Sequence, residues 1–427
     1  MAFAVTHHNR QGEPVTVVYD QTEVTLGRSR GNDFVIDSNH YPAVSRNHAR
    51  FVLQDGRATV WDLGSTSGVL LNKKAIKESA PLKQGAEIRL DALKMRVHWR
   101  PEGSTGEGDQ LPWGFPLALW RDFPSRFQRF ERIGAGAYGE VWRAFCRPDG
   151  STVAVKVLLR EDPRGGTDTN AMMRSRQDVM DSRSVIERFH READVTQRLV
   201  ASGAPNIVPV MEAGGDPETG LLYMIMEYIE GQSLGSLAAA EHPIPQRRVC
   251  RFLHHIAQAL EAAHAFEWRN DFTQSDLKGI IHRDITPANV LIRKSDDRAL
   301  LCDFGIAAIQ EGGLRLTQPE LQVTALRYTP PEALIDDIIS PFQDLWALAV
   351  LGYIVLSGGV PPYVGERPTD LLQGIRHRGP QPLGRYRKDL DPELIALLRQ
   401  GLHSERAERP QSATEWKERL APFADLS

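Results

Sequence analysis

Residues 282–289 read HRDITPAN, and residues 303–305 read DFG. Two further motifs precede them: residues 133–141 read IGAGAYGEV, a GxGxxG pattern between strand-like segments, and residues 153–156 read VAVK. The glycine pattern by itself fits an ordinary glycine turn as well as a loop whose N–H groups cover phosphates. A lysine at a strand position shortly afterwards favours the second interpretation, because its amine can reach phosphate oxygens. Four ordered motifs rarely coincide by chance, so they decide the interpretation of this half of the chain.

The segments around these motifs predict an α+β domain. Strand-like runs at residues 140–145 and 152–159 come first, and segments with helical periodicity follow them. The polar insertion at residues 267–278, EWRNDFTQSDLK, is expected to form a surface loop. Within residues 252–264 the apolar side chains recur at the spacing of an amphipathic helix, with one face formed by Leu253, Ile256, Ala257, Leu260 and Ala263.

The first hundred residues have a different pattern. Residues 22–99 alternate short strand-like runs with turn residues, as all-β sandwiches do. The clearest element is the pair ARFVLQ and RATVWD, because Asp55-Gly56 between them readily adopts the backbone angles of a tight hairpin turn. Residues 101–114, PEGSTGEGDQLPWG, have the composition of a linker. We therefore predict an all-β domain at residues 1–100, a linker at 101–121 and an α+β domain at 122–427.

Composition and charge restrict the possible partners. The 427 residues are 41% hydrophobic and 25% charged, which is typical of a globular protein, and the net charge of -4 gives no general attraction for nucleic acid or anionic lipid. None of the three cysteines lies in a CxxC pair, so neither disulfides nor zinc are indicated. The start of the chain lacks the apolar core of a signal peptide, and the longest apolar run is too short for a membrane span. We expect a cytoplasmic protein with neither nucleic-acid nor membrane partners.

Three more positions complete a family pattern in the second half. The triplet Pro330-Pro331-Glu332, then Asp344 and finally Arg409 follow the DFG motif in that order. Together with the four motifs, they make residues 122–425 resemble the eukaryotic-type (Hanks-type) protein kinases, and their bacterial members most of all. The resemblance implies a bilobal α+β fold that uses ATP and Mg²⁺ to transfer the γ-phosphoryl group to hydroxyls of protein substrates.

The same resemblance implies a role for each motif. The lysine of VAVK would orient the α- and β-phosphates and pair with a helical glutamate, while the HRD aspartate would accept or orient the proton of the substrate hydroxyl. The asparagine of the HRDITPAN motif and the DFG aspartate would bind magnesium, and residues 226–229 would form the gatekeeper and hinge. The implied catalytic residues are Lys156, Glu192, Asp284, Asn289 and Asp303, the last two being the metal ligands. The implied nucleotide-binding residues are Ile133, Gly134, Gly136, Gly139, Val141, Ala154, Lys156, Glu227 and Ile229.

Two departures from the family pattern affect the expected rate. Kinases of this type usually carry a lysine two residues after the catalytic aspartate, where this chain has Thr286, and a threonine bonded to it, where this chain has Ala325. The joint loss is coherent because neither remaining group is left without its partner. Since removal of one transition-state donor costs about a hundredfold in rate or more, we expect slow turnover or local compensation.

Arg283, before the catalytic aspartate, suggests control by a phosphorylated activation segment, because a buried arginine gains from a phosphate partner. Thr317 is the first choice of phosphosite, and Thr324 and Thr329 are alternatives. The competing interpretation is that Thr317 is an ordinary solvated loop residue.

Near the N-terminus, LGR at residues 26–28, SRNH at 45–48 and DLGSTSG at 62–68 occur in an order that resembles the forkhead-associated (FHA) domain. That family is a β-sandwich that binds phosphothreonine peptides, through a charged arginine fork and hydroxyl donors on loops at one end. We expect His48 to brace these loops, and a sandwich that serves only as a docking surface is the alternative. Ser67 stands where the family commonly has asparagine, so peptide preference is expected to differ. The expected phosphothreonine-binding residues are Arg28, Ser45, Arg46, Thr66 and Ser67.

These features favour an ATP-dependent serine/threonine protein kinase whose N-terminal domain reads phosphothreonine in partner proteins or in its own phosphorylated segments. The first alternative is a pseudokinase that works as a phosphopeptide-binding scaffold, and the retained catalytic set argues against it. The second alternative is a small-molecule phosphotransferase of kinase-like fold. Such enzymes generally lack the stretch from DFG to the PPE glutamate that receives a peptide.

Overall fold

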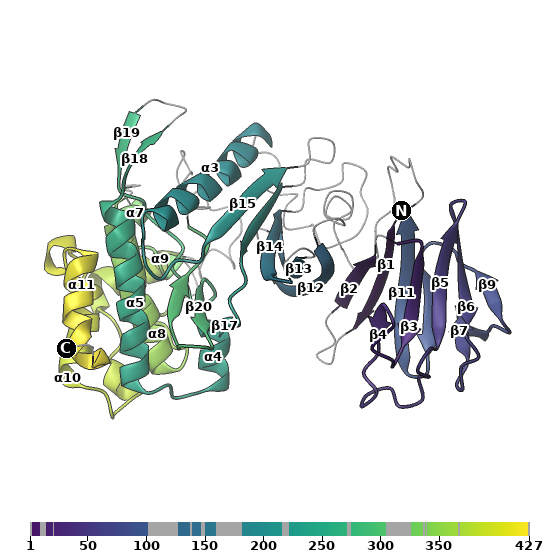
Figure 1. The fold of residues 1–427 in the computed structure, drawn as a ribbon. Coiled ribbons are helices and arrows are strands. Elements are labelled where there is room, and N and C mark those ends of the chain that lie inside the picture. Colours follow the sequence, from purple (N-terminus) through teal and green to yellow (C-terminus); the bar gives the residue numbers. More distant parts are fainter. Residues whose placement is uncertain are drawn as a thin grey trace. The chain divides into compact units, whose positions relative to one another are not determined.

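The computed structural model divides the chain into two compact units (Figure 1). The first comprises residues 1–164 and 212–228, and the second comprises residues 165–211 and 229–427, so the chain passes between them at the predicted hinge. The structure describes residues 2–8, 14–19, 21–100, 127–136, 139–146, 150–158, 182–215, 222–270, 275–304, 326–335, 338, 340–365 and 368–425. The predicted linker at 101–121 lies outside these residues.

The N-terminal part of the first unit is a β-sandwich. One sheet has the strand order β4-β3-β5-β6-β9, and the facing strands follow the order β2-β1-β11-β10-β7-β8. The predicted hairpin is formed by β5 and β6, and its turn has positive φ at Asp55 (49°) and Gly56 (73°). The first sheet consists of β3 (Glu23–Gly27), β4 (Phe34–Val35), β5 (Ala49–Gln54), β6 (Arg57–Asp62) and β9 (Ser79–Pro81). The facing strands are β1 (Ala2–His8), β2 (Pro14–Tyr19), β7 (Val69–Leu71), β8 (Lys74–Ala75), β10 (Ala86–Leu90) and β11 (Leu93–Arg100).

The second of these sheets continues beyond β2 into strands from the predicted α+β domain. The full order is β15-β16-β14-β13-β12-β2-β1-β11-β10-β7-β8, which makes eleven strands in one sheet. The added strands are β12 (Phe127–Gly136), β13 (Gly139–Cys146), β14 (Thr152–Leu158), β15 (Val210–Gly215) and β16 (Leu222–Glu227). This continuity was not predicted, because strand pairing between domains leaves no local mark in the sequence.

The second unit is mainly helical, and its described residues also form a three-stranded sheet and a two-stranded hairpin. Its three-stranded sheet has the order β17-β20-β21, from β17 (Gly231–Ser233), β20 (Val290–Arg293) and β21 (Ala299–Leu301). The α-helices are α3 (Ser182–Ala201), α4 (Leu234–Ala240), α5 (Gln246–Ala265), α7 (Pro331–Ile335), α8 (Phe342–Ser357), α9 (Pro368–Gln373), α10 (Pro392–Gly401) and α11 (Ala413–Leu420). Short helices of other types are η3 (Gly374–Arg378), η4 (Leu383–Arg385), η5 (Arg406–Glu408) and η6 (Ala421–Ala424).

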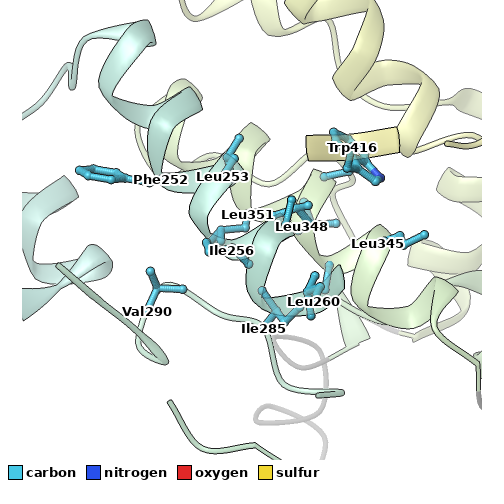
Figure 2. Packing of buried hydrophobic residues seen from close by; sticks show 14 of the residues in the cluster. Phe252, Leu253, Ile256, Leu260, Ile285, Val290, Leu345, Leu348, Leu351 and Trp416 are labelled. Atoms are coloured by element: carbon cyan, nitrogen blue, oxygen red, sulfur yellow. The ribbon is translucent and has the colours of Figure 1, made fainter. Parts of the chain in front are cut away.

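The core of the second unit forms where α5 packs against α8 (Figure 2). The predicted amphipathic face of α5 contributes Leu253 and Ile256, and α8 contributes Leu348. Helix α8 is apolar on nearly all sides, as expected of a helix surrounded by other elements. A Cβ at Gly352 would lie 2.8 Å from Cδ1 of Leu253, so a larger residue there would displace the leucine side chain. Burial of each leucine stabilises the fold by about 2 kcal/mol.

The predicted surface loop at residues 267–278 is a β-hairpin, so that prediction was wrong. Its strands are β18 (Glu267–Asn270) and β19 (Ser275–Lys278), and the hairpin projects from the end of α5 (Figure 1). The loop was predicted from polar composition, yet backbone N–H and C=O groups can pair in a two-stranded ribbon whatever the polarity of the side chains. Among the described residues, no helix is long and apolar enough to cross a membrane.

Candidate functional site

The loops at one end of the sandwich bring three of the predicted phosphate-binding residues together. The backbone N–H of Arg28 donates to the carbonyl of Ser45 at 3.1 Å, which joins the loop after β3 to the loop before β5. The backbone N–H of Thr66 donates to Ser45 Oγ at 3.0 Å, and the two hydroxyls lie 3.3 Å apart. A guanidinium-bearing residue and two hydroxyl-bearing residues therefore share one edge of the sandwich.

Two residues hold this arrangement in place. A Cβ at Gly27 would lie 2.2 Å from the carbonyl oxygen of Arg46, so only glycine allows the two loops to approach this closely. His48 is fully buried; its Nδ1 accepts from the N–H of Ser45 at 3.0 Å, and its Nε2 lies 3.1 Å from the carbonyl of Gly68. Burial lowers the pKa of His48, although the Gly68 carbonyl opposes this effect. The ring thus favours the neutral form that accepts at Nδ1 and donates at Nε2, and it braces the loops as expected.

The side chains at this edge remain open to solvent. Arg28, Arg46, Thr66 and Ser67 are exposed, and the Ser67 hydroxyl donates to the carbonyl of Ala43 at 3.1 Å. Two exposed arginines beside exposed hydroxyl-bearing residues form a surface that suits an anionic ligand. The Ser67 hydroxyl therefore bonds within its own domain. The asparagine that the family commonly has at this position would instead bond to the backbone of a bound peptide.

In the same unit, four of the predicted nucleotide residues lie at matching positions of three adjacent strands. Gly134 on β12 pairs with Val141 on β13, and Val141 pairs with Lys156 on β14. Ala154 lies two residues before Lys156 and so shares its face. Lys156 is only 5% exposed, and the residues on the opposite face of β14 pack into an apolar cluster that includes Val155. The structure therefore places the lysine on the strand next to β13, whose other neighbour is the glycine-bearing strand β12.

In the second unit, the β20–β21 hairpin positions both predicted metal ligands. Strand β20 begins directly after Asn289, and β21 ends two residues before Asp303. The two residues therefore leave the hairpin at the same end. The N–H of Cys302 donates to the carbonyl of Asn289 at 3.0 Å, which fixes this end of the hairpin.

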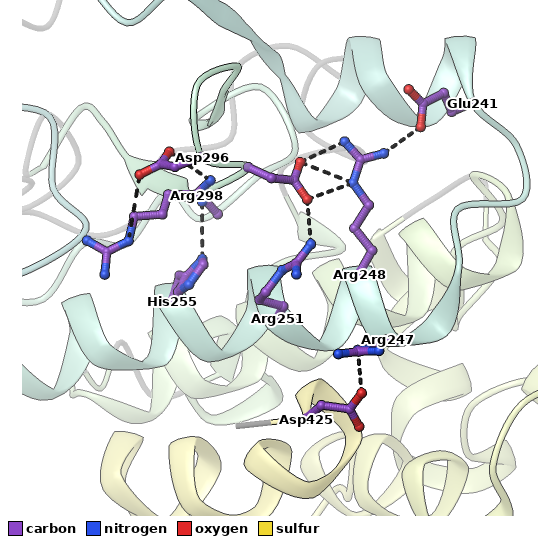
Figure 3. Close-up of polar contacts among 10 residues, drawn as sticks. Glu241, Arg247, Arg248, Arg251, His255, Asp296, Arg298 and Asp425 are labelled. Carbon is purple, nitrogen blue, oxygen red and sulfur yellow. Dashed lines mark hydrogen bonds and ion pairs between the residues drawn. The ribbon is translucent and has the colours of Figure 1, made fainter. Parts of the chain in front are cut away.

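The opposite end of this hairpin is tied to α5 by ion pairs (Figure 3). Arg248 donates to Asp297 at 2.7 Å and to Glu241 at 2.5 Å, and Arg251 donates to the other oxygen of Asp297 at 2.6 Å. Charge-assisted hydrogen bonds are stronger than neutral ones, and Asp297 accepts several of them from the two arginines of α5. They therefore fix the β20–β21 hairpin, which carries the predicted metal ligands at its other end.

The HRD segment is held by one buried carboxylate. Asp344 on α8 has no exposed surface and accepts from the backbone N–H groups of His282 and Arg283, each at 2.8 Å. His264 Nε2 lies 2.8 Å from the same carboxylate. Burial by itself raises the pKa of Asp344, but the contacts with His264 and the backbone outweigh it, so the pKa is lowered. An ionised Asp344 therefore fixes the backbone directly before Asp284.

Asp284 and Asn289 lie in direct contact. Asn289 Nδ2 donates to the Asp284 carboxylate at 2.8 Å and to its carbonyl at 2.9 Å. Because the amide nitrogen is engaged in this way, the amide oxygen points away from Asp284. That oxygen and the carboxylate of Asp303 are hard oxygen donors, the type that Mg²⁺ prefers, so the residues present fit the metal.

Arg327 was not predicted from the sequence. Arg327 is half-buried, and its Nε is fully buried yet makes no hydrogen bond within the described part of the chain. Next to it, burial raises the pKa of Tyr328 to about 12, with Arg327 lowering it and Asp284 raising it. The charges of Arg327 and Asp284 therefore both act on one hydroxyl. The only mark in the sequence of a second cation is the absence of the usual lysine, at Thr286.

The PPE glutamate and the late arginine also meet. Arg409 is 2% exposed, and it donates to both oxygens of Glu332, at 2.7 and 2.9 Å. It also lies over the ring of Trp346, whose ring stacks on Tyr363. A two-point bond of this kind fixes α7, which carries Glu332.

Several predicted residues cannot be placed. Gly305, Thr317, Thr324 and Ala325 lie outside the described residues. Glu192 lies on α3, but its side chain is likewise outside the description. Its pairing with Lys156 and the proposed phosphosite stay predictions.

Comparisons with known proteins agree with both halves of this description. The protein kinase domain model matches residues 127–419. The chain belongs to the protein kinase family. The FHA domain model matches residues 24–91, which confirms the predicted fold class of a β-sandwich followed by a kinase fold. We therefore use the names FHA domain and kinase domain below.

The curated relatives are bacterial serine/threonine kinases. Serine/threonine-protein kinase PknB of Mycolicibacterium smegmatis is 30% identical over 295 residues, which cover 68% of this chain and 42% of that protein. Serine/threonine-protein kinase pkn2 of Myxococcus xanthus is 31% identical over 302 residues, 69% of this chain and 32% of that protein. The chain thus spans less than half the length of these relatives. Among solved structures, the Mycobacterium tuberculosis PknI kinase domain matches with a TM-score of 0.46 and 25% identity, covering 69% of this chain and 96% of that one.

Proposed function

We propose that this protein is an ATP- and magnesium-dependent serine/threonine protein kinase. The observation that carries the proposal is the contact between Asp284 and Asn289, on a loop whose backbone Asp344 holds. A carboxylate oriented by an amide can accept the proton of an attacking hydroxyl, and phosphoryl transfer needs positioning and charge neutralisation more than covalent help from the protein.

The remaining roles follow from the same chemistry. Lys156 and the N–H groups of the glycine loop would hold phosphate oxygens, and Glu227 and Ile229 would bond to adenine through their backbone. When bound, Mg²⁺ would neutralise the developing charge on the phosphates, held by the oxygens of Asn289 and Asp303. Arg283 suits control by a phosphorylated activation segment, since burial lowers its pKa and a phosphate partner would offset the cost of that burial.

Transfer of labelled phosphate separates this proposal from a pseudokinase scaffold. Incubation of the purified protein with Mg²⁺ and γ-labelled ATP should place label in the protein itself or in generic protein substrates, and chelation of Mg²⁺ should abolish the transfer. Binding of Mg-ATP without any incorporation would favour the scaffold. Label found only in small hydroxyl compounds would favour the small-molecule phosphotransferase.

The altered motif around Asp284 gives a prediction about rate. We propose that Arg327 supplies part of the positive charge that a lysine at position 286 would supply. The double substitution Thr286→Lys with Ala325→Thr restores both partners of the family's usual pair, so kcat should rise by about tenfold or more. In that background Arg327→Met should cost much less activity than in the wild type. Steady-state kinetics of the four proteins test this, with Thr286→Met as the control for side-chain bulk; equal losses in both backgrounds would contradict it.

We further propose that the FHA domain binds phosphothreonine peptides, from partner proteins or from the chain's own phosphorylated segments. Arg28 is exposed and its backbone N–H bonds to Ser45, whose hydroxyl in turn accepts from Thr66, so one edge of the domain offers a phosphate both charge and hydroxyl hydrogen bonds. The docking-surface alternative requires no phosphate recognition.

Removal of the arginine tests this binding site. We expect Arg28→Ala to weaken binding of a phosphothreonine peptide library by about tenfold to a hundredfold, because a charge-assisted bond of roughly 1.5–3 kcal/mol is lost. Arg57→Ala is the matched control: it removes the same charge from the β5–β6 turn, at the opposite end of these strands. Fluorescence anisotropy measures both, and capture of the same peptides with equal affinity by Arg28→Ala and wild type would show that the site is elsewhere.

A further inference from the structure

Strand β2 of the FHA domain pairs with strand β12 of the kinase domain. The antiparallel register places Val17 opposite Arg129, Thr16 opposite Phe130 and Val15 opposite Glu131. Strand β12 pairs on its other side with β13, so it lies inside the sheet instead of at an edge. An uncovered edge strand presents unpaired N–H and C=O groups, and β2 satisfies these groups here.

Side-chain packing supports the same contact independently. Along β1, Phe3 and Val5 point into the core of the FHA domain, so Ala4 points to the outer face of the sandwich. An outer face of an antiparallel sandwich is commonly solvated. Ala4 is nevertheless fully buried, in one apolar cluster with Phe130 and Trp142 of the kinase domain.

Two threonines extend this buried outer face. Thr6 is 2% exposed and Thr16 is 1% exposed, and their hydroxyls lie 2.9 Å apart. Each hydroxyl therefore has a partner although water is excluded, which avoids the cost of burying an unsatisfied polar group. Small side chains on the FHA strands thus face aromatic side chains on β12 and β13. Shape and hydrogen bonding both fit a permanent contact.

The paired strand leads directly into the glycine loop. Glu131 is the last residue of β12 that pairs with β2, and Gly134 follows three residues later. Glycines give a loop many conformations, so a loop that must close over phosphates loses entropy on binding. A strand fixed on both sides reduces that loss at the base of the loop.

We propose that the FHA domain holds the base of the glycine loop through β2 and thereby strengthens binding of Mg-ATP to the kinase domain. The effect on nucleotide rests on the kinase function proposed above, whereas the strand contact does not. The FHA domain then has two separate surfaces: the loop edge that carries Arg28, and the β1–β2 face that carries Thr6 and Thr16.

A designed disulfide in the full chain tests the strand contact. Val17→Cys with Arg129→Cys places thiols on directly opposite residues, whose Cα separation in antiparallel strands, about 4.5–5.5 Å, suits a disulfide. Mild oxidation should link most molecules, as measured by mass spectrometry of the joined peptides. The control pair Val17→Cys with Arg132→Cys is displaced by three residues, about 10 Å along the strand, and should not link. Equal linking of both pairs, or of neither, would overturn the contact.

A charge on the buried face tests the effect on nucleotide. Thr6→Lys should raise the Kd for Mg-ATP by about fivefold to tenfold, which corresponds to a loss of about 1–1.4 kcal/mol. It should leave phosphopeptide affinity within about twofold, which shows that the FHA fold is intact. Thr22→Lys, at an exposed position of the same domain, is the matched control and should leave both affinities unchanged.

The outcomes separate the two proposals. If the wild type binds Mg-ATP and Thr6→Lys binds it equally well, although the variant's Val17–Arg129 cross-link is lost, the role of the FHA domain at the glycine loop is refuted and the kinase proposal stands. If the wild type itself fails to bind Mg-ATP, the kinase proposal fails together with the nucleotide effect, and the cross-link still decides whether the strands pair.

Discussion

The substitution Asp284→Asn is expected to lower kcat for phosphate transfer by about a hundredfold to ten-thousandfold, the usual contribution of a general base. An asparagine has nearly the same shape and can still accept the bond from Asn289 Nδ2, so the loop should keep its conformation. It cannot accept the proton of the substrate hydroxyl. The Kd for Mg-ATP, measured by calorimetry, should therefore change by less than about threefold while transfer is lost.

Asp296→Asn is the matched control for this prediction. It removes a carboxylate of the same type from the turn at the other end of the β20–β21 hairpin, where Asp296 pairs with Arg293. We expect its kcat to stay within about twofold of the wild type, because surface ion pairs contribute little. Activity in Asp284→Asn equal to that in Asp296→Asn would remove Asp284 from the mechanism.

The second large effect concerns stability. Asp344→Ala should lower the free energy of unfolding of the second unit by roughly 3 kcal/mol or more, because it leaves the buried N–H groups of His282 and Arg283 without an acceptor. The same change frees the backbone before Asp284, so kcat should fall as well. Thermal unfolding and steady-state kinetics measure the two effects.

The stability effect should depend on pH in a defined direction. Because the pKa of Asp344 is lowered in the folded protein, its stabilising contribution is present above the ordinary carboxylate pKa and is lost as the pH falls through the folded pKa. The difference in unfolding free energy between wild type and Asp344→Ala should therefore shrink in acid. An unchanged melting temperature at neutral pH would contradict the role assigned to this carboxylate.

The sequence was sufficient for the elements whose signals are local. Asp55-Gly56 predicted a tight hairpin turn, and the apolar spacing in residues 252–264 predicted the buried face of α5; both are confirmed. The order of the motifs was sufficient for the family. The motif residues hold phosphate, metal and proton, and few other residue types can do so in their place.

The contacts that hold the site could not be predicted in the same way. Only its position in the family pattern marked Asp344. Nothing in the neighbouring sequence shows that its carboxylate accepts hydrogen bonds from the backbone of His282 and Arg283, 62 and 61 positions away. Ala4 and Thr6 have small side chains, which occur on solvated and on buried faces of a sheet alike. Their sequence therefore does not predict that kinase-domain strands cover them. The hairpin at 267–278 was missed because backbone pairing needs no apolar pattern. Long-range pairing is decided by the fold as a whole.

The most direct test of the central claim is phosphoamino acid analysis after transfer from γ-labelled ATP, with wild type and Asp284→Asn compared in Mg²⁺. The account predicts phosphoserine or phosphothreonine in the wild-type reaction and almost none with the variant. Mg-ATP bound by both proteins with no labelled hydroxyl amino acid in either reaction would contradict the claim that this protein is a serine/threonine kinase.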